Sequence, residues 1–417
     1  MNYSIRIDRH LIRAAGGSIR YALVSIVVPQ AAPKAGREPF HASLVLDRSG
    51  SMGGQKIVLA REAARLALQA LRPADRFSLV AYDDEVAAVV ESTKATAEAR
   101  RNAIAKLARI DARGSTDLHG GWKAGCDQLT AHLGAQQVGR CLLLTDGQAN
   151  VGIQDPAELA ALAGAARTTG RVATSTFGVG EDFDERLLRG MADASGGRFY
   201  YIERPEQIPD LLTSELGELL QVVARDVRLW LRLPTGVEAA PLNALTAATV
   251  GGDLGICLGD LVSGQQLDVV VELKFPKGHA GDTVAVEFGM AEWEGALVAP
   301  RQAIGWSYAA DRAHKAQTRE VIVDREVARL YAARARAEAL ELNREGKYKE
   351  ARAVLEKTAR RIDAYAGGDA ELKAIAEGLR GDGAAYEHSM NAKDQKVRYF
   401  ESYSISMNRM PDGKARR

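Results

Sequence analysis

The 417-residue sequence predicts a doubly wound α/β domain, inserted in an antiparallel β-sandwich and followed by a C-terminal helical region. Three changes of pattern along the chain predict this order. From about 40 to 221, apolar strand-like runs alternate with helical periodicity. From 222 onward, apolar and polar residues alternate strictly, which is typical of sheets with one solvated face. From about 319 to 391 the sequence is rich in Ala, Glu, Arg, Lys and Leu and contains no proline, which indicates long helices.

Residues 1–38 are expected to contribute strands to the sandwich. The segments YSIRID (3–8) and SIRYALVSIVVP (18–29) are strand-like, and no helix separates them. The later strands that they are expected to join are DVRLWLRL (226–233), LDVVVELKF (267–275) and TVAVEFGM (283–290). We therefore predict a sandwich built from residues 1–38 and 223–312, with the α/β domain at 39–222 inserted between its parts.

The α/β domain is expected to contain six strands and six helices. GRCLLLTD (139–146) is a continuous apolar run, as in a parallel strand that is buried on both faces. The expected strands are 42–47, 76–82, 85–92, 139–146, 171–179 and 197–202. The expected helices are 56–71, 96–109, one ending near 133, 156–168, 184–195 and 205–222.

Residues 313–391 are expected to form a helical hairpin or bundle. An apolar stripe predicts one long helix; it consists of Val327, Leu330, Ala333, Ala337 and Leu340. The breaks NREGKYKEA and GGD (367–369) predict a second and a third helix. The segment 392–417 is polar and weakly basic, with one strand-like piece at 397–405, and is expected to be a flexible, solvated tail.

Composition excludes several classes of protein. With 55 basic and 54 acidic residues, the net charge of +1 gives no global field to recruit nucleic acid or anionic lipid. Three cysteines without CxxC spacing are too few for a disulfide framework or a thiolate metal site. The start of the sequence lacks the apolar core of a signal peptide, and the apolar stretch 21–29 is too short to span a bilayer. We therefore expect a cytoplasmic protein with neither nucleic acid nor membrane as a partner.

Five oxygen-bearing residues stand at strand ends or in loops of the predicted sheet. Asp47 and Asp146 each end a buried strand, Ser49 and Ser51 lie in the turn after Asp47, and Thr116 lies in a third loop. Ligands of open α/β sheets bind beyond the carboxyl ends of the strands, near a topological switch point. Two carboxylates and three hydroxyls are hard donors, which suit Mg²⁺, Mn²⁺ or Ca²⁺ and not zinc or copper. We predict that these residues hold a divalent cation, with Mg²⁺ favoured over Mn²⁺ and Ca²⁺. Water or an oxygen from a partner would complete its coordination shell.

The segments DRSGSM (47–52), GSTDL (114–118) and LLLTDG (142–147) resemble the metal-ion-dependent adhesion site of the von Willebrand factor A domain family. All five positions of that motif are matched in order, and Arg48 fills a variable position. The resemblance implies the Rossmann-like fold of that family. It also implies that Ser49, Ser51 and Thr116 ligate through hydroxyls, and that Asp47 and Asp146 act directly or through water.

Over roughly 1–310, the order of strands, A domain and β-rich sequence is similar to bacterial relatives of inter-alpha-trypsin inhibitor heavy chains. Bacterial relatives of the A domain often accompany chaperone-like ATPases or signalling enzymes. By analogy alone, the resemblance therefore implies a partner protein of that kind.

Three functions stay open at this point. The first is a non-enzymatic interaction module in which an Asp or Glu from a partner protein supplies the missing metal ligand. The second is a structural scaffold whose ion only stabilises the loops. The third is a metal-assisted hydrolase. Two observations argue against it: no histidine, lysine or second carboxylate follows Asp47 at close spacing to act as acid or base, and no GxSxG, GxxxxGK[ST] or HExxH motif is present.

Several neighbours of the predicted site allow two interpretations. Arg48 and Arg113 could attract an acidic partner, although solvated surface positions are the simpler interpretation. Asp117 is expected to cap the following helix and not to bind metal. His119 is expected to lie in the first turn of that helix.

Two other groups of residues are expected to serve packing. Cys126 and Cys141 are most simply buried small residues. Trp230 lies on the polar side of its strand and is expected to pack within the fold, with an interaction surface as the alternative.

Overall fold

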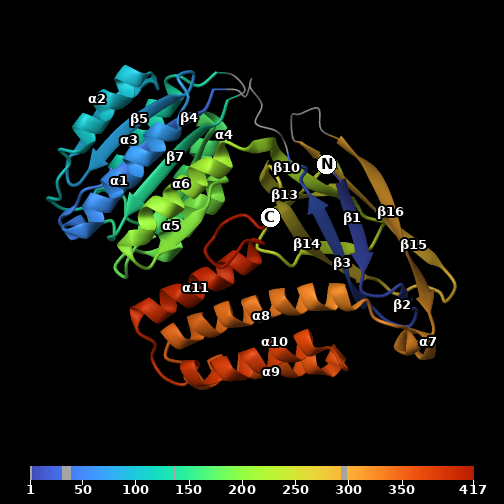
Figure 1. The fold of residues 1–417 in the computed structure, drawn as a ribbon. Helices are drawn as coiled ribbons and strands as arrows, with labels where there is room; N and C mark the ends of the chain where they lie inside the picture. Colours follow the sequence, from blue (N-terminus) through green and yellow to red (C-terminus); the bar gives the residue numbers. More distant parts are fainter. Residues whose placement is uncertain (1, 31–38, 135–136, 293–297) are drawn as a thin grey trace. The chain divides into compact units, whose positions relative to one another are not determined.

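The computed structural model describes residues 2–30, 39–134, 137–292 and 298–417 (Figure 1). The chain divides into two compact units, Pro33–Leu220 and the combination of Met1–Ala32 with Gln221–Arg417. We describe each unit by itself. Among the described residues, none of the helices combines the length and apolar character that a bilayer span requires.

The first unit is an α/β domain around one six-stranded sheet. In the order β6-β5-β4-β7-β8-β9, all strands are parallel to their neighbours except β6, which pairs antiparallel with β5. The strands are β4 (His41–Asp47), β5 (Arg76–Tyr82), β6 (Val86–Lys94), β7 (Gly139–Thr145), β8 (Val172–Val179) and β9 (Phe199–Ile202). The helices are α1 (Gln55–Ala70), α2 (Ala97–Leu107), α3 (Leu118–Thr130), α4 (Pro156–Gly170), α5 (Glu185–Ser195) and α6 (Ile208–Leu219), with short 3₁₀ turns η1 (Gly50–Met52) and η2 (Pro205–Gln207).

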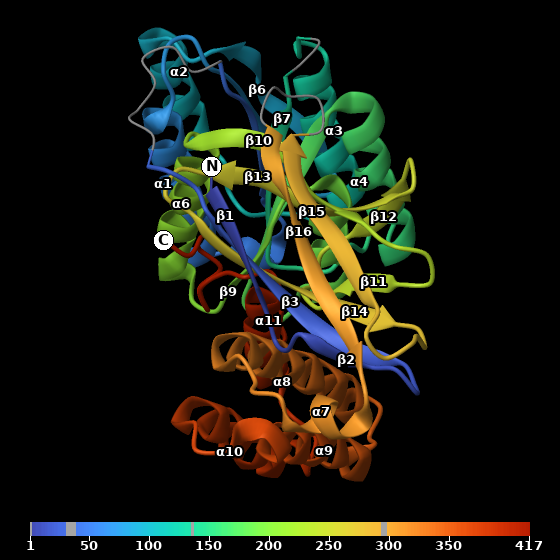
Figure 2. The same ribbon diagram turned by 90° about the vertical axis from the view of Figure 1, so that its right-hand side faces the viewer.

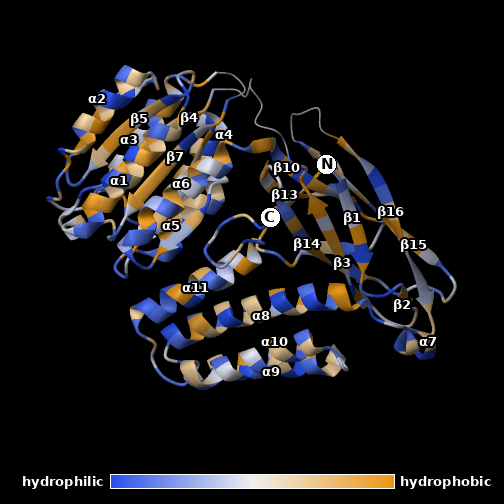
Figure 3. Cartoon of the chain, in the orientation of Figure 1, coloured by the Kyte–Doolittle hydropathy of each residue, from blue (hydrophilic) through white to orange (hydrophobic). Residues whose placement is uncertain are grey.

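The predicted α/β fold is confirmed. Every residue of β4 and of β7 is buried, which explains why these strands are continuous apolar runs in the sequence. Figure 3 shows the same strands dominated by hydrophobic residues, whereas the helices alternate between polar and apolar residues. The chain runs outward from β4 to β5 and β6 on one side, and from β7 to β8 and β9 on the other. The topological switch point therefore lies between β4 and β7.

The second unit contains two sheets. The four-stranded sheet has the order β1-β3-β14-β11, with β1 (Asn2–Ile7), β3 (Ser18–Val27), β14 (Gln266–Phe275) and β11 (Glu238–Pro241). The six-stranded sheet has the order β12-β13-β10-β15-β16-β2. Its strands are β12 (Ala247–Val250), β13 (Asp253–Val262), β10 (Val222–Arg232), β15 (Thr283–Glu292), β16 (Val298–Ala309) and β2 (Leu11–Arg13).

The N-terminal strands pair with strands from beyond the α/β domain, as predicted. β3 runs antiparallel to β14 along its whole length, from Ser18 opposite Phe275 to Val27 opposite Gln266. Figure 2 shows the long pair β15 and β16 in the other sheet. One hydrophobic cluster draws on both sheets, with Val24 and Val269 from the smaller sheet and Leu229 and Phe288 from the larger.

Trp230 serves packing within its sheet. A β-carbon on Gly255 of the neighbouring strand β13 would lie 2.7 Å from the indole ring, so the ring covers this glycine. The expected packing role of Trp230 is therefore confirmed.

The C-terminal helical region is also confirmed. It consists of α7 (Asp311–Ala316), α8 (Val321–Arg344), α9 (Tyr348–Ala366), α10 (Ala370–Gly383), the 3₁₀ turn η3 (Ala384–Tyr386) and α11 (Ala392–Ser406). The break between α8 and α9 contains Gly346 at φ 75°, a conformation that suits glycine. Asp369 caps α10 by accepting a hydrogen bond from Leu372 N at 2.9 Å.

The prediction of a flexible tail with a strand-like piece at 397–405 is wrong. These residues lie within the helix α11, which Asn391 caps by accepting a hydrogen bond from Asp394 N at 2.8 Å. α11 packs against α8 and buries Phe400 and Tyr403. The aromatic and β-branched residues that favour a strand locally are held in a helix by this packing.

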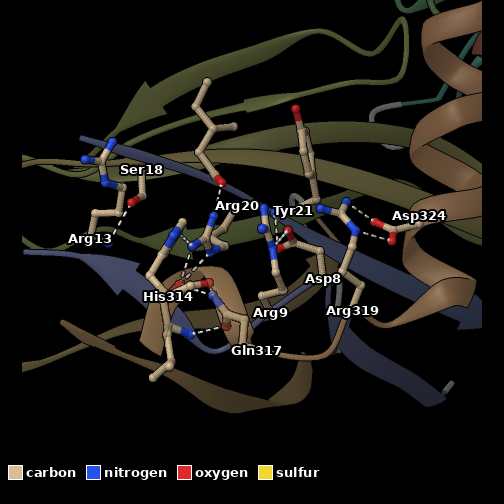
Figure 4. A network of polar contacts seen from close by, with 12 residues as sticks. Asp8, Arg9, Arg13, Ser18, Arg20, Tyr21, His314, Gln317, Arg319 and Asp324 are labelled. Carbon is tan, nitrogen blue, oxygen red and sulfur yellow. Dashed lines mark hydrogen bonds and ion pairs between the residues drawn. The ribbon is translucent and has the colours of Figure 1, made fainter. Parts of the chain in front are cut away.

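A buried polar network joins the N-terminal strands to α7 and α8 within the second unit (Figure 4). Asp8 and Arg20 are only 1% and 2% exposed. Asp8 accepts a hydrogen bond from Tyr21 N at 2.9 Å, and Arg20 Nε donates to Leu11 O at 2.9 Å and contacts His314 through its guanidinium group. Near the start of α8, Arg319 makes a two-point ion pair with Asp324 (Figure 4). The contact between Arg20 and His314 ties the strand β3 to the helix α7.

Candidate metal-binding site

The switch point of the sheet brings the two predicted carboxylates together. Asp47 is the last residue of β4, Asp146 directly follows β7, and these two strands are neighbours. Both side chains are fully buried. Because parallel strands end at one edge of a sheet, residues almost a hundred positions apart in sequence meet here.

Asp47 is held by uncharged donors. Its Oδ1 accepts a hydrogen bond from Ser49 N at 2.7 Å, and its Oδ2 accepts one from the Thr145 hydroxyl at 2.5 Å. Burial raises the pKa of Asp47 to about 6, although the hydrogen bonds from Ser49 and Thr145 oppose the rise. A buried carboxylate without a cationic partner of its own is suited to binding a cation.

The two serines connect the first loop to Asp146. Ser49 Oγ lies 3.1 Å from Ser51 Oγ, and Ser51 donates a hydrogen bond to Asp146 Oδ1 at 2.7 Å. The turn η1, which contains Ser51, follows β4 directly and curls this hydroxyl back toward the sheet edge. Four of the five predicted ligands therefore form one chain of contacts.

Thr116 reaches the same place from a third loop. A β-carbon built on Gly147 would lie 3.5 Å from Ser51 Oγ and 3.6 Å from Thr116 Oγ1, so both hydroxyls face the same small space above Gly147. Thr116 N donates to Asn150 Oδ1 at 2.8 Å, and Thr116 O accepts from Asn150 N at 3.1 Å. The structure thus brings all five predicted residues to one location.

Backbone contacts fix the first and the third loop to each other. Gly50 N donates to Gly114 O at 3.1 Å, and Arg113 N donates to Arg48 O at 2.7 Å. Gly114 has a φ of 69°, and a β-carbon there would lie 1.9 Å from Asp84 Oδ1. A glycine is required at this point, because any side chain would displace the loop that carries Thr116.

The simpler interpretation holds for the exposure of Arg113, whose side chain is 55% exposed, but not for Arg48, whose side chain is 14% exposed. Both bind the buried carboxylate of Asp83: Arg48 Nη2 at 3.2 Å from Oδ1, and Arg113 Nε at 2.7 Å from Oδ2. Arg113 also pairs with Glu85. The physical reason is that the end of β5 places Asp83 between the two loops, where a buried carboxylate needs cationic partners.

Asp83 is a residue of the site region that sequence reasoning missed. Burial raises the pKa of its carboxyl, but hydrogen bonds from Glu85 N, Arg113 and Arg48 outweigh that effect and leave the pKa below its usual value. The run DDE at 83–85 directly after a predicted strand was the available signal.

Lys56 is a second residue that sequence reasoning missed. Its Nζ contacts Asp146 Oδ2 in an ion pair, and its side chain is 25% exposed. Lys56 lies in the first turn of α1, where the helix dipole disfavours a cation. That unfavourable placement was the signal that the lysine has a specific partner.

The expected roles of the remaining neighbours are confirmed. Asp117 caps α3 by accepting a hydrogen bond from Gly120 N at 2.8 Å, and His119 lies in the first turn of that helix. Cys126 and Cys141 are buried.

The chemistry of the donors fits a hard divalent cation. The described residues contain no group of three or more His, Cys, Asp or Glu side chains placed to hold a metal ion. Asp47 and Asp146 supply two carboxylates, and hydroxyls supply the rest, which is the all-oxygen donor set that hard divalent cations prefer. These residues would hold the ion, and the ion would supply a Lewis-acidic position for a further oxygen.

Comparison with known proteins identifies the domain that carries this site. Residues 43–214 match the family model described as von Willebrand factor type A domain. The chain contains a von Willebrand factor type A domain. Domains of this family commonly mediate protein interactions, often through a divalent cation at a metal-ion-dependent adhesion site.

Two relatives are similar to less than half of this chain. The protein YfbK of Escherichia coli (strain K12) is 32% identical over 186 residues, which cover 44% of this chain and 32% of YfbK. Inter-alpha-trypsin inhibitor heavy chain H1 of Bos taurus is 28% identical over 197 residues, which cover 44% of this chain and 21% of that protein. The chain therefore spans a third or less of either relative.

A solved structure is similar along the whole chain. The von Willebrand factor type A protein from Catenulispora acidiphila superposes with a TM-score of 0.73 at 18% identity, and the match covers 100% of this chain and 97% of that one. At this identity the likeness shows the fold alone. It includes the regions that flank the A domain.

Proposed function

We propose that the A domain is a metal-dependent protein-interaction module. In this proposal a divalent cation, with Mg²⁺ favoured, is held by Asp47, Ser49, Ser51, Thr116 and Asp146. An Asp or Glu side chain of a partner protein completes the coordination shell.

One observation carries the proposal. The hydroxyls of Ser51 and Thr116 face one small space above Gly147, and Ser51 is bonded to a fully buried Asp146. Two carboxylates and three hydroxyls from three loops thus meet at the switch point of the sheet. Five donors fall short of the six that octahedral Mg²⁺ takes, so a position is left for water or a partner's oxygen.

The surroundings of the site favour binding over hydrolysis. A general base must be able to accept a proton, and the ionisable neighbours are committed to other contacts. Both oxygens of Asp83 accept hydrogen bonds, from Arg48 and Glu85 N on one and from Arg113 on the other. Lys56 is paired with Asp146. We therefore propose that this site does not catalyse a reaction.

Calorimetric titration with Mn²⁺ tests the metal site directly. The wild type is expected to bind one equivalent, whereas Asp146→Ala and the Ser49→Ala/Ser51→Ala double variant are expected to lose the binding. Ser115→Ala is the matched control, because this exposed serine lies beside Thr116 but makes no side-chain contact with the five residues. Equal Mn²⁺ binding by the wild type and both site variants would show that the ion sits elsewhere.

A pull-down from native lysate, with and without chelator, tests the interaction. Partner capture that depends on both metal and Asp146 supports the module. Capture that ignores chelator, while metal still raises the melting temperature, would favour the alternative of a structural scaffold with a stabilising ion. Turnover of a generic phosphoester that is lost in Asp47→Asn would favour the hydrolase instead.

We also propose an architecture and a location for the module. The two sheets are inferred to form a β-sandwich, because one hydrophobic cluster contains residues of both sheets. The A domain is inferred to be inserted in this sandwich, because β3 precedes the domain in the sequence and pairs with β14, which follows it. A cytoplasmic location is proposed from the sequence and can be checked by cell fractionation.

A further inference from the structure

The two carboxylate oxygens of Asp146 contact different groups. Its Oδ1 accepts the hydroxyl of Ser51, on the side of the predicted ligands, while its Oδ2 contacts the ammonium group of Lys56. A β-carbon on Gly180 would lie 3.8 Å from Lys56 Nζ, so the ammonium group lies near the end of β8. Lys56 therefore approaches Asp146 from the side of the neighbouring strand and leaves Oδ1 to the other ligands.

The charged side chains that contact the five predicted ligands can be counted residue by residue. Asp47 is held by the Ser49 amide and the Thr145 hydroxyl, which are uncharged. Arg48 and Arg113 are bound to Asp83. Within the described part of the chain, Lys56 is the cation that the structure places in contact with the five predicted ligands.

The count gives the site an uneven charge. Asp47 and Asp146 bring two negative charges and Lys56 returns one, so a divalent ion held there would leave one positive charge uncompensated. Without Lys56, the same ion would be neutralised by the protein alone. A unit charge a few ångströms away, at the effective dielectric of a partly buried site, changes an affinity by about tenfold or more.

We propose that Lys56 determines the specificity of the site for an anionic last ligand. Its charge lowers the affinity of the protein for the divalent ion and raises the affinity of the resulting site for a carboxylate. This inference rests on the proposed function, and it assigns the preference for an acidic partner to one residue outside the five ligands.

The proposed role of Lys56 can be distinguished by experiment from a purely structural role. A lysine that only positions Asp146 would, when removed, weaken metal and carboxylate binding together. A lysine that sets the charge of the site would, when removed, strengthen metal binding and weaken carboxylate binding. The two effects have opposite signs, so one pair of measurements decides between the roles.

The test uses the full chain with Mn²⁺ as the metal and ¹³C-labelled acetate as the carboxylate. Calorimetry gives the Mn²⁺ affinity, and the paramagnetic relaxation of the acetate carboxyl carbon reports direct coordination. The variants are Lys56→Met, which removes the charge, and Lys56→Arg, which keeps it. Lys123→Met is the matched control, because Lys123 is exposed on α3 and pairs with Asp127. Lys56→Gln, which keeps a donor for Asp146 without the charge, replaces Lys56→Met if that variant does not fold.

Lys56→Met is expected to bind Mn²⁺ about tenfold more tightly than the wild type and acetate about tenfold more weakly. Lys56→Arg and Lys123→Met are expected to follow the wild type. Without metal, Lys56→Met is expected to melt at a lower temperature, because Asp146 loses its counterion, and to gain more from Mn²⁺ than the wild type does.

The possible failures are distinguishable. Unchanged or weaker Mn²⁺ binding in Lys56→Met and Lys56→Gln, with normal binding in the wild type, overturns the role of Lys56 and leaves the proposed function in place. Absence of Mn²⁺ binding in the wild type and in every variant overturns the proposed function, and the inference about Lys56 falls with it.

Discussion

Gly121 of α3 lies directly against the ring of Tyr82, so closely that a β-carbon on the glycine would come within 2.3 Å of Tyr82 Cγ. One turn later, a β-carbon on Gly125 would come within 2.4 Å of Val45 Cγ2. These two glycines let α3 approach β4 and β5 more closely than a helix with side chains could. Because Thr116 lies in the loop that leads into α3, this approach also sets the position of a predicted metal ligand.

Gly121→Ala is expected to destabilise the A domain by about 1–3 kcal/mol, because the added methyl group must displace a buried ring. Gly217→Ala is the matched control, since Gly217 also lies in a helix of this domain and a β-carbon there meets nothing within 4 Å. The control is expected to be neutral or up to about 1 kcal/mol more stable. Urea unfolding measures both, and equal midpoints for the two variants would contradict the close packing of α3.

Thr116→Val is expected to weaken Mn²⁺ binding by about tenfold, equivalent to about 1.4 kcal/mol, while the stability of the metal-free domain changes little. The substitution keeps the shape of the side chain and removes the oxygen that faces Gly147. The backbone bonds of Thr116 to Asn150 are retained. Calorimetry beside Ser115→Ala, which should bind like the wild type, checks the expectation. An unaltered affinity in Thr116→Val would remove this residue from the ligand set.

Asp83→Asn is expected to cost about 2 kcal/mol at neutral pH, because Arg48 and Arg113 lose their shared carboxylate. The pKa of Asp83 is lower in the folded protein than its ordinary value of 3.8. The ionised group therefore stabilises the fold above that value, and the stabilisation is lost as the pH falls below it. The stability difference between the wild type and Asp83→Asn should thus narrow below about pH 4.

The matched control for Asp83 is Asp111→Asn. Asp111 is 86% exposed and pairs with Arg61, so its loss should cost less than about 1 kcal/mol. Chemical unfolding of both variants between neutral and acidic pH provides the comparison. A gap for Asp83→Asn that is as small as that for Asp111→Asn would show that the buried carboxylate does not hold the two loops.

Phe400→Ala is expected to destabilise the second unit by about 3 kcal/mol, because α11 buries this ring to 6% exposure. Glu401→Ala, on the exposed side of the same helix, should change stability by less than about 0.5 kcal/mol. Hydrogen exchange of the amides in 392–406 would show the loss of protection in the first variant only. Rapid exchange of these amides in the wild type would instead favour the flexible tail that the sequence predicts.

The order of elements in the A domain could be predicted because its parallel strands are buried on both faces. The run GRCLLLTD needs no tertiary information to be recognised as such a strand, and the ends of two such strands must share an edge. The convergence of Asp47 and Asp146 follows from that rule alone. Thr116 could be added because its loop precedes a helix in the same alternating pattern.

Other features depend on contacts between distant residues and could not be predicted in this way. The segment 397–405 has local preferences for a strand, and only its packing on α8 makes it a helix. The first-turn position of Lys56 signals that it has a partner, but that this partner is Asp146 depends on where α1 begins relative to β7. Arg48 and Arg113 are separated by 65 positions, and their shared partner Asp83 appears only once β5 lies beside β4.

Because Gly147 has no side chain, a substitution there could block the metal site without removing any of the five predicted ligands. In Gly147→Ala, all five oxygen-bearing side chains would be retained, and the new methyl group would meet Ser51 Oγ at 3.5 Å and Thr116 Oγ1 at 3.6 Å, which are ordinary packing distances. The folded domain should accept this change, yet the methyl group would stand in the space that both hydroxyls face. Cells that carry this allele would then express a normally folded protein in which only the entry of the ion is obstructed.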